Sequence, residues 1–243
     1  AGVRQSDIYC GDTYRTFRDV YWDKCHAEYP GVHYVDGLGI NGREQVTPSA
    51  EDFLFFSDGL RSSRLPEEYL DADYFINMSC LKSHNAAGIT LCTKNHQGSY
   101  LQTGAGPAEQ SAGDMHYCFP ISPGYEGYGK YRHLVDFMAH EKLGGNTLLY
   151  IVDGLWAGRD WKGIVEKWTM EPFSGDYPSS VFLSLDPVAI ECVGRDFLWE
   201  EYKDKDDQYP YYNGVDDYLL QAADPTSWPA GISYDPENDG TPI

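Results

Sequence analysis

The chain has 243 residues, of which 42% are hydrophobic, and this is enough for a globular fold with a substantial core. Its formal net charge of −20 repels nucleic acids and anionic lipids, so we expect no nucleic-acid binding. No stretch is long and apolar enough to span a bilayer, so we do not expect a membrane-spanning protein.

The N-terminal residues predict a β–α–β unit. Residues 7–10 and 32–36 have strand patterns, and residues 13–29 between them have the pattern of an amphipathic helix. This order predicts a parallel strand pair. The following residues 37–42 match GxGxxG, but the dinucleotide motif needs a helix directly after it, and none is indicated. We interpret the segment as a glycine-rich turn.

Three further strand patterns follow, at residues 74–80, 147–153 and 181–184. Helical patterns alternate with them, at residues 65–70, 86–93, 130–142, 186–202 and 215–223. This alternation predicts an α/β fold with a mixed, mainly parallel sheet, helices on both faces and long loops at the carboxyl edge of the strands. We predict one domain over residues 1–203, with a Tyr- and Pro-rich extension over residues 204–243 packed on it.

The six cysteines form no CxxC pair, so a zinc ribbon or thioredoxin motif is absent. Cys80 and Cys192 lie in apolar segments typical of buried free thiols. The better disulfide candidates are Cys10, Cys25, Cys92 and Cys118. Disulfides fit an extracellular address. We predict a secreted or cell-surface protein whose upstream leader has been removed.

Polar side chains follow three of the predicted strands. Lys82 and His84 come after residues 74–80. Asp153 ends the next strand, and Asp186 follows the last. Ligands of open α/β sheets bind beyond the carboxyl ends of strands, so we expect these groups to converge. The other histidines, namely His26, His33, His116 and His140, show no comparable clustering in the sequence.

Several of these segments together resemble the DUF362 family, whose biochemical role is not established. The resemblance rests on residues 76–84, 88–98, 132–136, 149–154 and 184–191, which are similar to the family's motifs in order and spacing. Glu191 stands where the family usually has Asp. No cluster of closely spaced cysteines follows, so the ferredoxin-like iron–sulfur module of some relatives is not expected. Family members often carry export signals, which implies a secreted protein, but the resemblance implies no agreed reaction.

Our first hypothesis is an exported, metal-assisted enzyme acting on an anionic or carbohydrate-type substrate. His84 would act as a general base, with Lys82 on the same face of an extended segment. Glu191, inside an apolar helical pattern, is a further catalytic candidate, and it needs a partner if it is buried. Lys94 and Asn95 could bind an anionic substrate group, although a lysine near a helix C-terminus also favours the helix dipole.

The same hypothesis includes a divalent metal, either calcium or a transition metal. His133 and Asp136 are three residues apart on one helix face and, with Asp153 and Asp186, could form a mixed nitrogen and oxygen site. The alternative is a network of helix caps and core hydrogen bonds. Asp186 precedes a proline at a helix start and is a ready N-cap.

The second hypothesis is a non-catalytic surface protein that binds glycan or assembles with copies of itself. Its contacts would come from the tyrosine-rich loops, since the chain has 20 tyrosines with an apolar ring and a polar tip. In this case the polar residues near the strand ends form a structural network. A small molecule or a glycan is therefore the expected ligand, and a homo-oligomer is a possible assembly.

Overall fold

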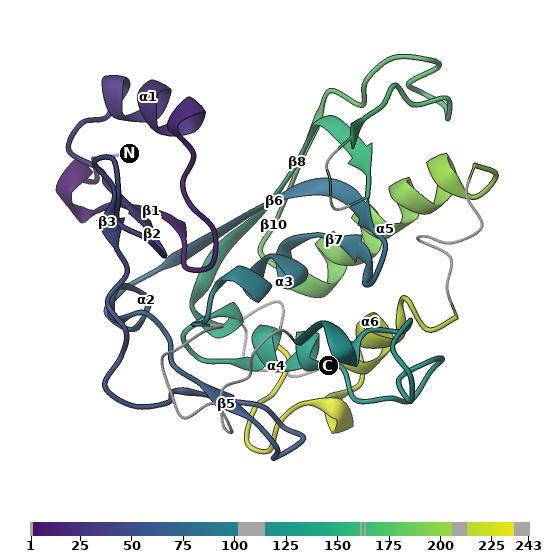
Figure 1. Cartoon of the computed structure of the whole chain (residues 1–243). Coiled ribbons are helices and arrows are strands. Elements are labelled where there is room, and N and C mark those ends of the chain that lie inside the picture. Colours follow the sequence, from purple (N-terminus) through teal and green to yellow (C-terminus); the bar gives the residue numbers. More distant parts are fainter. Residues whose placement is uncertain (1, 102–114, 161, 163, 206–212, 236–243) are drawn as a thin grey trace. The chain divides into compact units, whose positions relative to one another are not determined.

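A computed structural model of the chain describes residues 2–101, 115–160, 162, 164–205 and 213–235 (Figure 1). Contacts divide the chain into two compact units. Unit 1 comprises Ala1–Ala72 and Gln97–Gly113, and unit 2 comprises Asp73–His96 and Asp114–Ile243. We expected residues 99–130, rich in Gly, Pro and Ser, to form a long loop, and residues 102–114 of this segment lie outside the described residues. The predicted boundary near residue 203 stays a prediction.

Unit 1 contains the predicted β–α–β unit. Its elements are η1 (Gln5–Asp7), β1 (Tyr9–Asp12), α1 (Asp19–Glu28), β2 (His33–Asp36), β3 (Glu44–Gln45), β4 (Leu54–Phe55), β5 (Ser62–Ser63) and α2 (Glu67–Leu70). Strands β1 and β2 are parallel, which confirms the predicted pair, and β3 extends this sheet in parallel beside β2. Strands β4 and β5 form a separate antiparallel pair.

Helix α1 begins at Asp19, six residues later than the start of the helix predicted over residues 13–29. The carboxylate of Asp12 accepts hydrogen bonds from the backbone N–H groups of Tyr14 and Arg15, and the backbone N–H of Thr13 donates to the carbonyl of Gly98. These bonds hold the start of the predicted helix in a turn.

Residues 37–42 form a turn as expected, since Asp36 accepts from the backbone N–H groups of Leu38 and Gly39.

Unit 2 contains a larger mixed sheet. Its strands are β6 (Phe75–His84), β7 (Gly88–Thr90), β8 (Thr147–Arg159), β9 (Ile164–Val165) and β10 (Ser180–Ser184). They run in the order β10-β8-β6-β7, with β9 beside β8. Only β6 and β8 are parallel, and the other described pairs are antiparallel. The mixed α/β class is confirmed, with parallel pairing limited to the centre of this sheet.

The helices of unit 2 agree with all but one of the helical segments predicted there. They are α3 (Cys92–Asn95), η2 (His96–Gly98, at the junction with unit 1), η3 (Met115–Cys118), α4 (His133–Ala139), η4 (Gly144–Asn146), α5 (Pro187–Tyr202), α6 (Asp217–Ala222) and η5 (Pro225–Ser227). We expected a helix over residues 86–93, but Gly88–Thr90 instead pairs with β6. Gly88 has a φ of +84°, a conformation that glycine adopts readily, and it reverses the chain so that the β-branched pair after it forms a strand.

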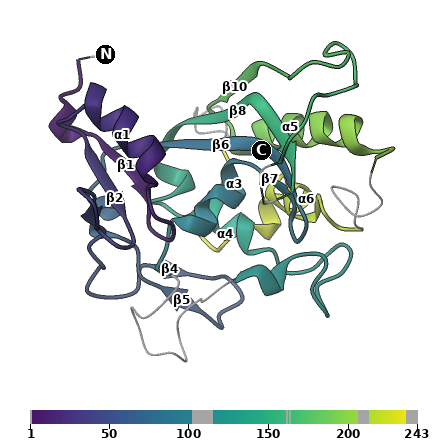
Figure 2. The same cartoon turned by 45° about the horizontal axis from the view of Figure 1, so that its top comes forward.

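In the described part, α3 and α5 pack on the same face of this sheet rather than one on each (Figure 2). The side chains of Asn77 and Ser79 contact Cys92 of α3, and Leu81 lies near Gly194 of α5. Between Ile76 and Cys80 the alternate residues of β6 are exposed, including Ile76 at 57% and Met78 at 61%. The opposite face of the sheet is therefore apolar and open, which corrects our expectation of helices on both faces.

The cysteines also depart from expectation. Cys80 lies on the open face of the sheet and is exposed, and Cys192 is exposed on α5. We expected both to be buried, because apolar neighbours in sequence do not reveal which face of a strand or helix is covered. Cys92 and Cys118 are the buried cysteines, and none of the six is in a disulfide. Within the described residues, no helix has the length and apolar character to cross a membrane.

Candidate functional site

His84 is the last residue of β6, and its environment fixes its protonation. Its Nδ1 atom accepts hydrogen bonds from the backbone N–H groups of Ala86 and Ala87, at 3.0 and 3.1 Å. The proton of the neutral ring therefore lies on Nε2. Burial, followed by the nearby charges of Lys94, Lys82 and His116, lowers the pKa of His84 to about 2. His84 is thus a neutral hydrogen-bond donor throughout the physiological pH range.

Four basic side chains gather around the ring of Phe119, and we call them the histidine–lysine cluster: His84, Lys94, His116 and His133. The rings of His84 and His116 stack with centroids 5.7 Å apart. Both His116 and His133 contact Phe119, at centroid distances of 5.2 and 5.1 Å. The Nζ atom of Lys94 lies 5.5 Å from the centre of the same ring. Strand β6 and helices α3, η3 and α4 each supply one member.

The cluster is largely withdrawn from water. His133 is fully buried, and Lys94 is only 9% exposed. Burial lowers the pKa of His133 well below its usual value, and Lys94, His116 and Arg132 lower it further. Phe137 also contacts the His133 ring, at a centroid distance of 5.3 Å. These side chains concentrate nitrogen donors in a chain whose overall charge is strongly negative.

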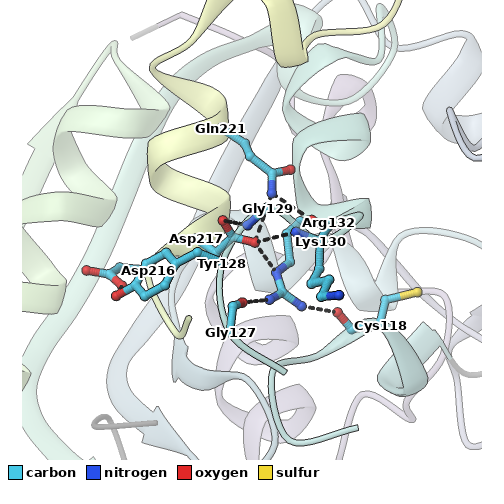
Figure 3. A network of polar contacts seen from close by, with 9 residues as sticks. All are labelled: Cys118, Gly127, Tyr128, Gly129, Lys130, Arg132, Asp216, Asp217 and Gln221. Atoms are coloured by element: carbon cyan, nitrogen blue, oxygen red, sulfur yellow. Dashed lines mark hydrogen bonds and ion pairs between the residues drawn. The ribbon is translucent and has the colours of Figure 1, made fainter. Parts of the chain in front are cut away.

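A buried ion pair holds the segments that carry this cluster (Figure 3). Arg132, directly before His133, donates from Nε to Oδ2 of Asp217 on α6 at 2.8 Å. Its other nitrogens donate to the carbonyls of Cys118 and Gly127, at 2.9 and 2.5 Å. Asp217 also accepts from the backbone N–H of Gly129 at 2.9 Å. The network therefore joins α6, the start of α4 and the segment that follows His116.

Glu191, which we proposed as catalytic, is in α5, and its carboxylate contacts the start of α3. It is fully buried and accepts hydrogen bonds from the backbone N–H of Thr93 at 2.6 Å and the hydroxyl of Tyr218 at 2.5 Å. Burial raises its pKa to about 7, although these hydrogen bonds oppose the shift. Its contacts tie α5, α3 and α6 together, which is a structural role.

Lys82 and Asn95 have surroundings different from those of the cluster. Lys82 is half-buried, and burial lowers its pKa while the charges of Cys80 and Asp160 oppose that change. Asn95 donates from Nδ2 to Oδ1 of Asn77 and to the carbonyl of Met78, at 3.0 and 3.1 Å. Asn95 therefore fastens α3 to β6 rather than facing a ligand.

The predicted metal ligands have hydrogen-bond partners of their own. Asp136 accepts from the hydroxyl of Tyr131 at 2.6 Å, and Asp153 accepts from the backbone N–H two residues later. Asp186 caps α5 by accepting from two backbone N–H groups, and it also accepts from the hydroxyl of Tyr234. In the described part of the chain, no three His, Cys, Asp or Glu side chains are placed to hold a metal ion. The metal site stays a prediction that this geometry does not support.

His116 is the member of the cluster that sequence reasoning missed. It lies in a segment rich in Gly, Pro and Ser, far in sequence from His84 and His133. Its only local signal is Phe119 three residues later, on the adjacent turn. The contact between His84 and His116 depends on how the chain returns to the end of β6, which sequence spacing does not give.

Comparison with known proteins gives the family. A family model described as Domain of unknown function (DUF362) matches residues 16–196. The chain belongs to the DUF362 family. Neither a curated protein nor a solved structure matches it. The DUF362 match includes all four members of the histidine–lysine cluster, whereas Asp217 lies beyond the matched residues.

Proposed function

We propose that this DUF362 protein binds an anionic group, either a carboxylate or a phosphate, at the histidine–lysine cluster. The observation that carries the proposal is the burial of Lys94 beside three histidines whose rings surround one phenylalanine. An ammonium group attracts an anion more strongly in a site of low dielectric than in water. Lys94 would supply the charge, and imidazole N–H groups would supply hydrogen bonds.

His84 has a defined role in this proposal. Its Nδ1 atom accepts from two backbone N–H groups, so the proton of the neutral ring lies on Nε2, which is the donor atom. A base with a pKa of about 2 removes protons poorly near neutral pH. We therefore infer that His84 donates a hydrogen bond to the anion, in place of the general-base role of our first hypothesis.

The test is isothermal titration of the full chain with inorganic phosphate and with succinate at pH 7.5 and low salt. We expect Lys94→Met to weaken binding about tenfold or more, which corresponds to ~1.4 kcal/mol. His84→Gln should weaken it less. Lys167→Met is the matched control, because Lys167 is exposed and lies on another segment of unit 2. The proposal fails if neither probe binds the wild-type chain, or if Lys94→Met binds as well as Lys167→Met.

The wider hypothesis of an exported, metal-assisted enzyme remains a proposal that this site could serve. A neutral imidazole N–H next to a bound anionic substrate can donate to negative charge that develops on the substrate during a reaction, and so stabilise it. Metal analysis of the purified chain by mass spectrometry tests the metal. A stoichiometric transition metal would support the hypothesis, and its absence from protein purified without chelators would count against it.

Self-assembly, part of the second hypothesis, is favoured by the open face of the larger sheet. Met78, Ile151 and Leu183 lie in register across β6, β8 and β10, and form an apolar row. We propose a second copy of the chain as the occupant. With a net charge of −20, two copies repel each other least where uncharged surfaces meet.

Sedimentation velocity tests this assembly. The wild-type chain should be dimeric at micromolar concentration, and Leu183→Glu should make it monomeric. Leu220→Glu, at a similarly exposed leucine on α6, should leave the dimer intact. A monomeric wild-type chain, or an equal effect of both substitutions, would refute the proposal.

A further inference from the structure

Two cysteines of unit 1 lie on facing elements of the β–α–β unit. Cys10 is in β1, where its partner in the parallel register is Tyr34 of β2. Residues directly opposite in a sheet point to the same side of it. Cys10 and Tyr34 therefore share one face, and the contacts of Tyr34 show which element covers that face.

The element is α1, at its C-terminal end. The ring of Tyr34 lies 6.1 Å from that of His26, and its hydroxyl donates to the carbonyl of Tyr29 at 3.2 Å. Cys25 directly precedes His26, and its carbonyl accepts from the backbone N–H of Tyr29 at 2.7 Å. The turn of α1 that contains Cys25 thus lies over the side of the sheet to which Cys10 belongs.

The electrostatics of the two thiols agree with this placement. Desolvation and then the negative charge of a Cys25 thiolate raise the pKa of Cys10. Burial and then the charges of Cys25 and Cys10 raise the pKa of Tyr34. A cysteine whose pKa is raised is a poor nucleophile, so Cys10 suits a lasting covalent link better than a catalytic role.

We propose that Cys10 and Cys25 form a disulfide when the protein is in an oxidising compartment. A small-molecule disulfide such as oxidised glutathione is the oxidant. One cysteine thiolate attacks it and releases one glutathione thiolate, and the second cysteine then attacks the mixed disulfide and releases the other. The two cysteines lose two protons and two electrons, and one oxidised glutathione becomes two reduced glutathiones.

The weak packing of α1 on its sheet indicates what this disulfide would stabilise. None of the residues of α1 is fully buried, so few core contacts hold the helix on its sheet. Its Asp19 forms an ion pair with Arg43, but Asp19 is exposed, and such pairs add little stability. A disulfide between β1 and α1 closes a loop in the unfolded chain and lowers its conformational entropy. It therefore stabilises the folded unit.

The experiment uses the full chain, incubated in reduced and in oxidised glutathione and then denatured for thiol titration. The number of free thiols should fall from six to four on oxidation. Tryptic mapping without reductant should join the peptide of residues 5–15 to that of residues 25–43. Cys10→Ser and Cys25→Ser should each lack this linked peptide pair, whereas Cys80→Ser should keep it.

Thermal unfolding gives a second measurement. Oxidation should raise the Tm of the wild-type chain and of Cys80→Ser, and should leave the Tm of Cys10→Ser and Cys25→Ser unchanged. The proposal is overturned if six thiols remain after oxidation, or if Cys10 is found joined to a cysteine other than Cys25. Anion binding in unit 2 is measured separately and does not depend on this outcome.

Discussion

Arg132 and Asp217 form an ion pair across 85 residues of sequence, with side chains only 2% and 4% exposed. Burial lowers the pKa of Arg132, and the carboxylate of Asp217 opposes that change. The remaining polar atoms of the pair bind backbone groups of the segment from Cys118 to Gly129. A buried pair with this many hydrogen bonds is costly to break, because the surviving charge stays buried without its partner.

The first prediction is that Asp217→Asn destabilises the protein by about 3–5 kcal/mol. Urea unfolding followed by circular dichroism measures this change. Asp196→Asn is the control, since Asp196 pairs with Arg195 on an exposed surface and should contribute about 1 kcal/mol or less. Similar losses in the two variants would show that the buried network has no special role.

The second prediction is that acid destabilises the protein through its buried histidines. His84 and His96 have pKa values lowered mainly by burial, to about 2 and about 3, and burial lowers that of His133 as well. Below pH 6.5 the unfolded state therefore binds more protons than the folded state, so stability falls as the pH falls. Each histidine contributes ~1.4 kcal/mol per pH unit.

Urea unfolding at pH 7 and pH 5.5 tests this expectation. The loss should be about 2 kcal/mol, because the three histidines together cost about 4 kcal/mol and one carboxylate, Glu191, offsets about 2 kcal/mol of this. His96→Gln should reduce the dependence on pH whatever its effect on stability at pH 7. Equal stability at the two pH values would contradict the burial of these rings in the neutral form.

The third prediction isolates Glu191. Its pKa is raised from about 4.5 to about 7, mainly by burial, so between these values the folded state binds the extra proton. The stability of the wild-type chain relative to Glu191→Gln should therefore fall by about 3 kcal/mol between pH 5 and pH 8. Glu200→Gln, at an exposed position of the same helix, is the control. A constant difference between the wild type and Glu191→Gln would rule out the shift.

The fourth prediction separates capping from ligand binding at Asp186. Asp186→Ala removes the acceptor for two backbone N–H groups at the start of α5 and should cost about 1–2 kcal/mol. Asp186→Asn should recover part of this loss. Neither variant should change the affinity for phosphate, because Asp186 is not part of the cluster. A loss of phosphate affinity without a loss of stability would give Asp186 a role in the site.

The sequence predicted elements well where local signals were strong. Asp186 and Pro187 mark the start of α5, and the apolar run at residues 147–153 is within β8. Local pattern failed at residues 88–90, which suit either a helix or a strand until the chain folds back on β6. The pattern also failed to show which face of β6 is covered. Asn77 and Ser79 face α3, whereas Ile76 and Met78 face outward.

The candidate site was predicted only in part for a related reason. His84, Lys94 and His133 follow or begin regular elements, so their positions could be argued from the ends of those elements. His116 could not, because its place depends on a loop that Arg132 binds through the carbonyl of Cys118. Every residue has a backbone carbonyl that can accept a hydrogen bond, whatever its side chain. Such contacts therefore cannot be predicted from a single sequence.

The ion pair between Arg132 and Asp217 also sets an order of events during synthesis on the ribosome. His84, Lys94, His116 and His133 all leave the ribosome before Asp217 does. Until α6 has emerged, the guanidinium that organises the segment from Cys118 to Gly129 lacks its counter-charge. A growing chain that stops short of this helix therefore carries every member of the cluster but lacks the carboxylate that binds Arg132 and Gly129.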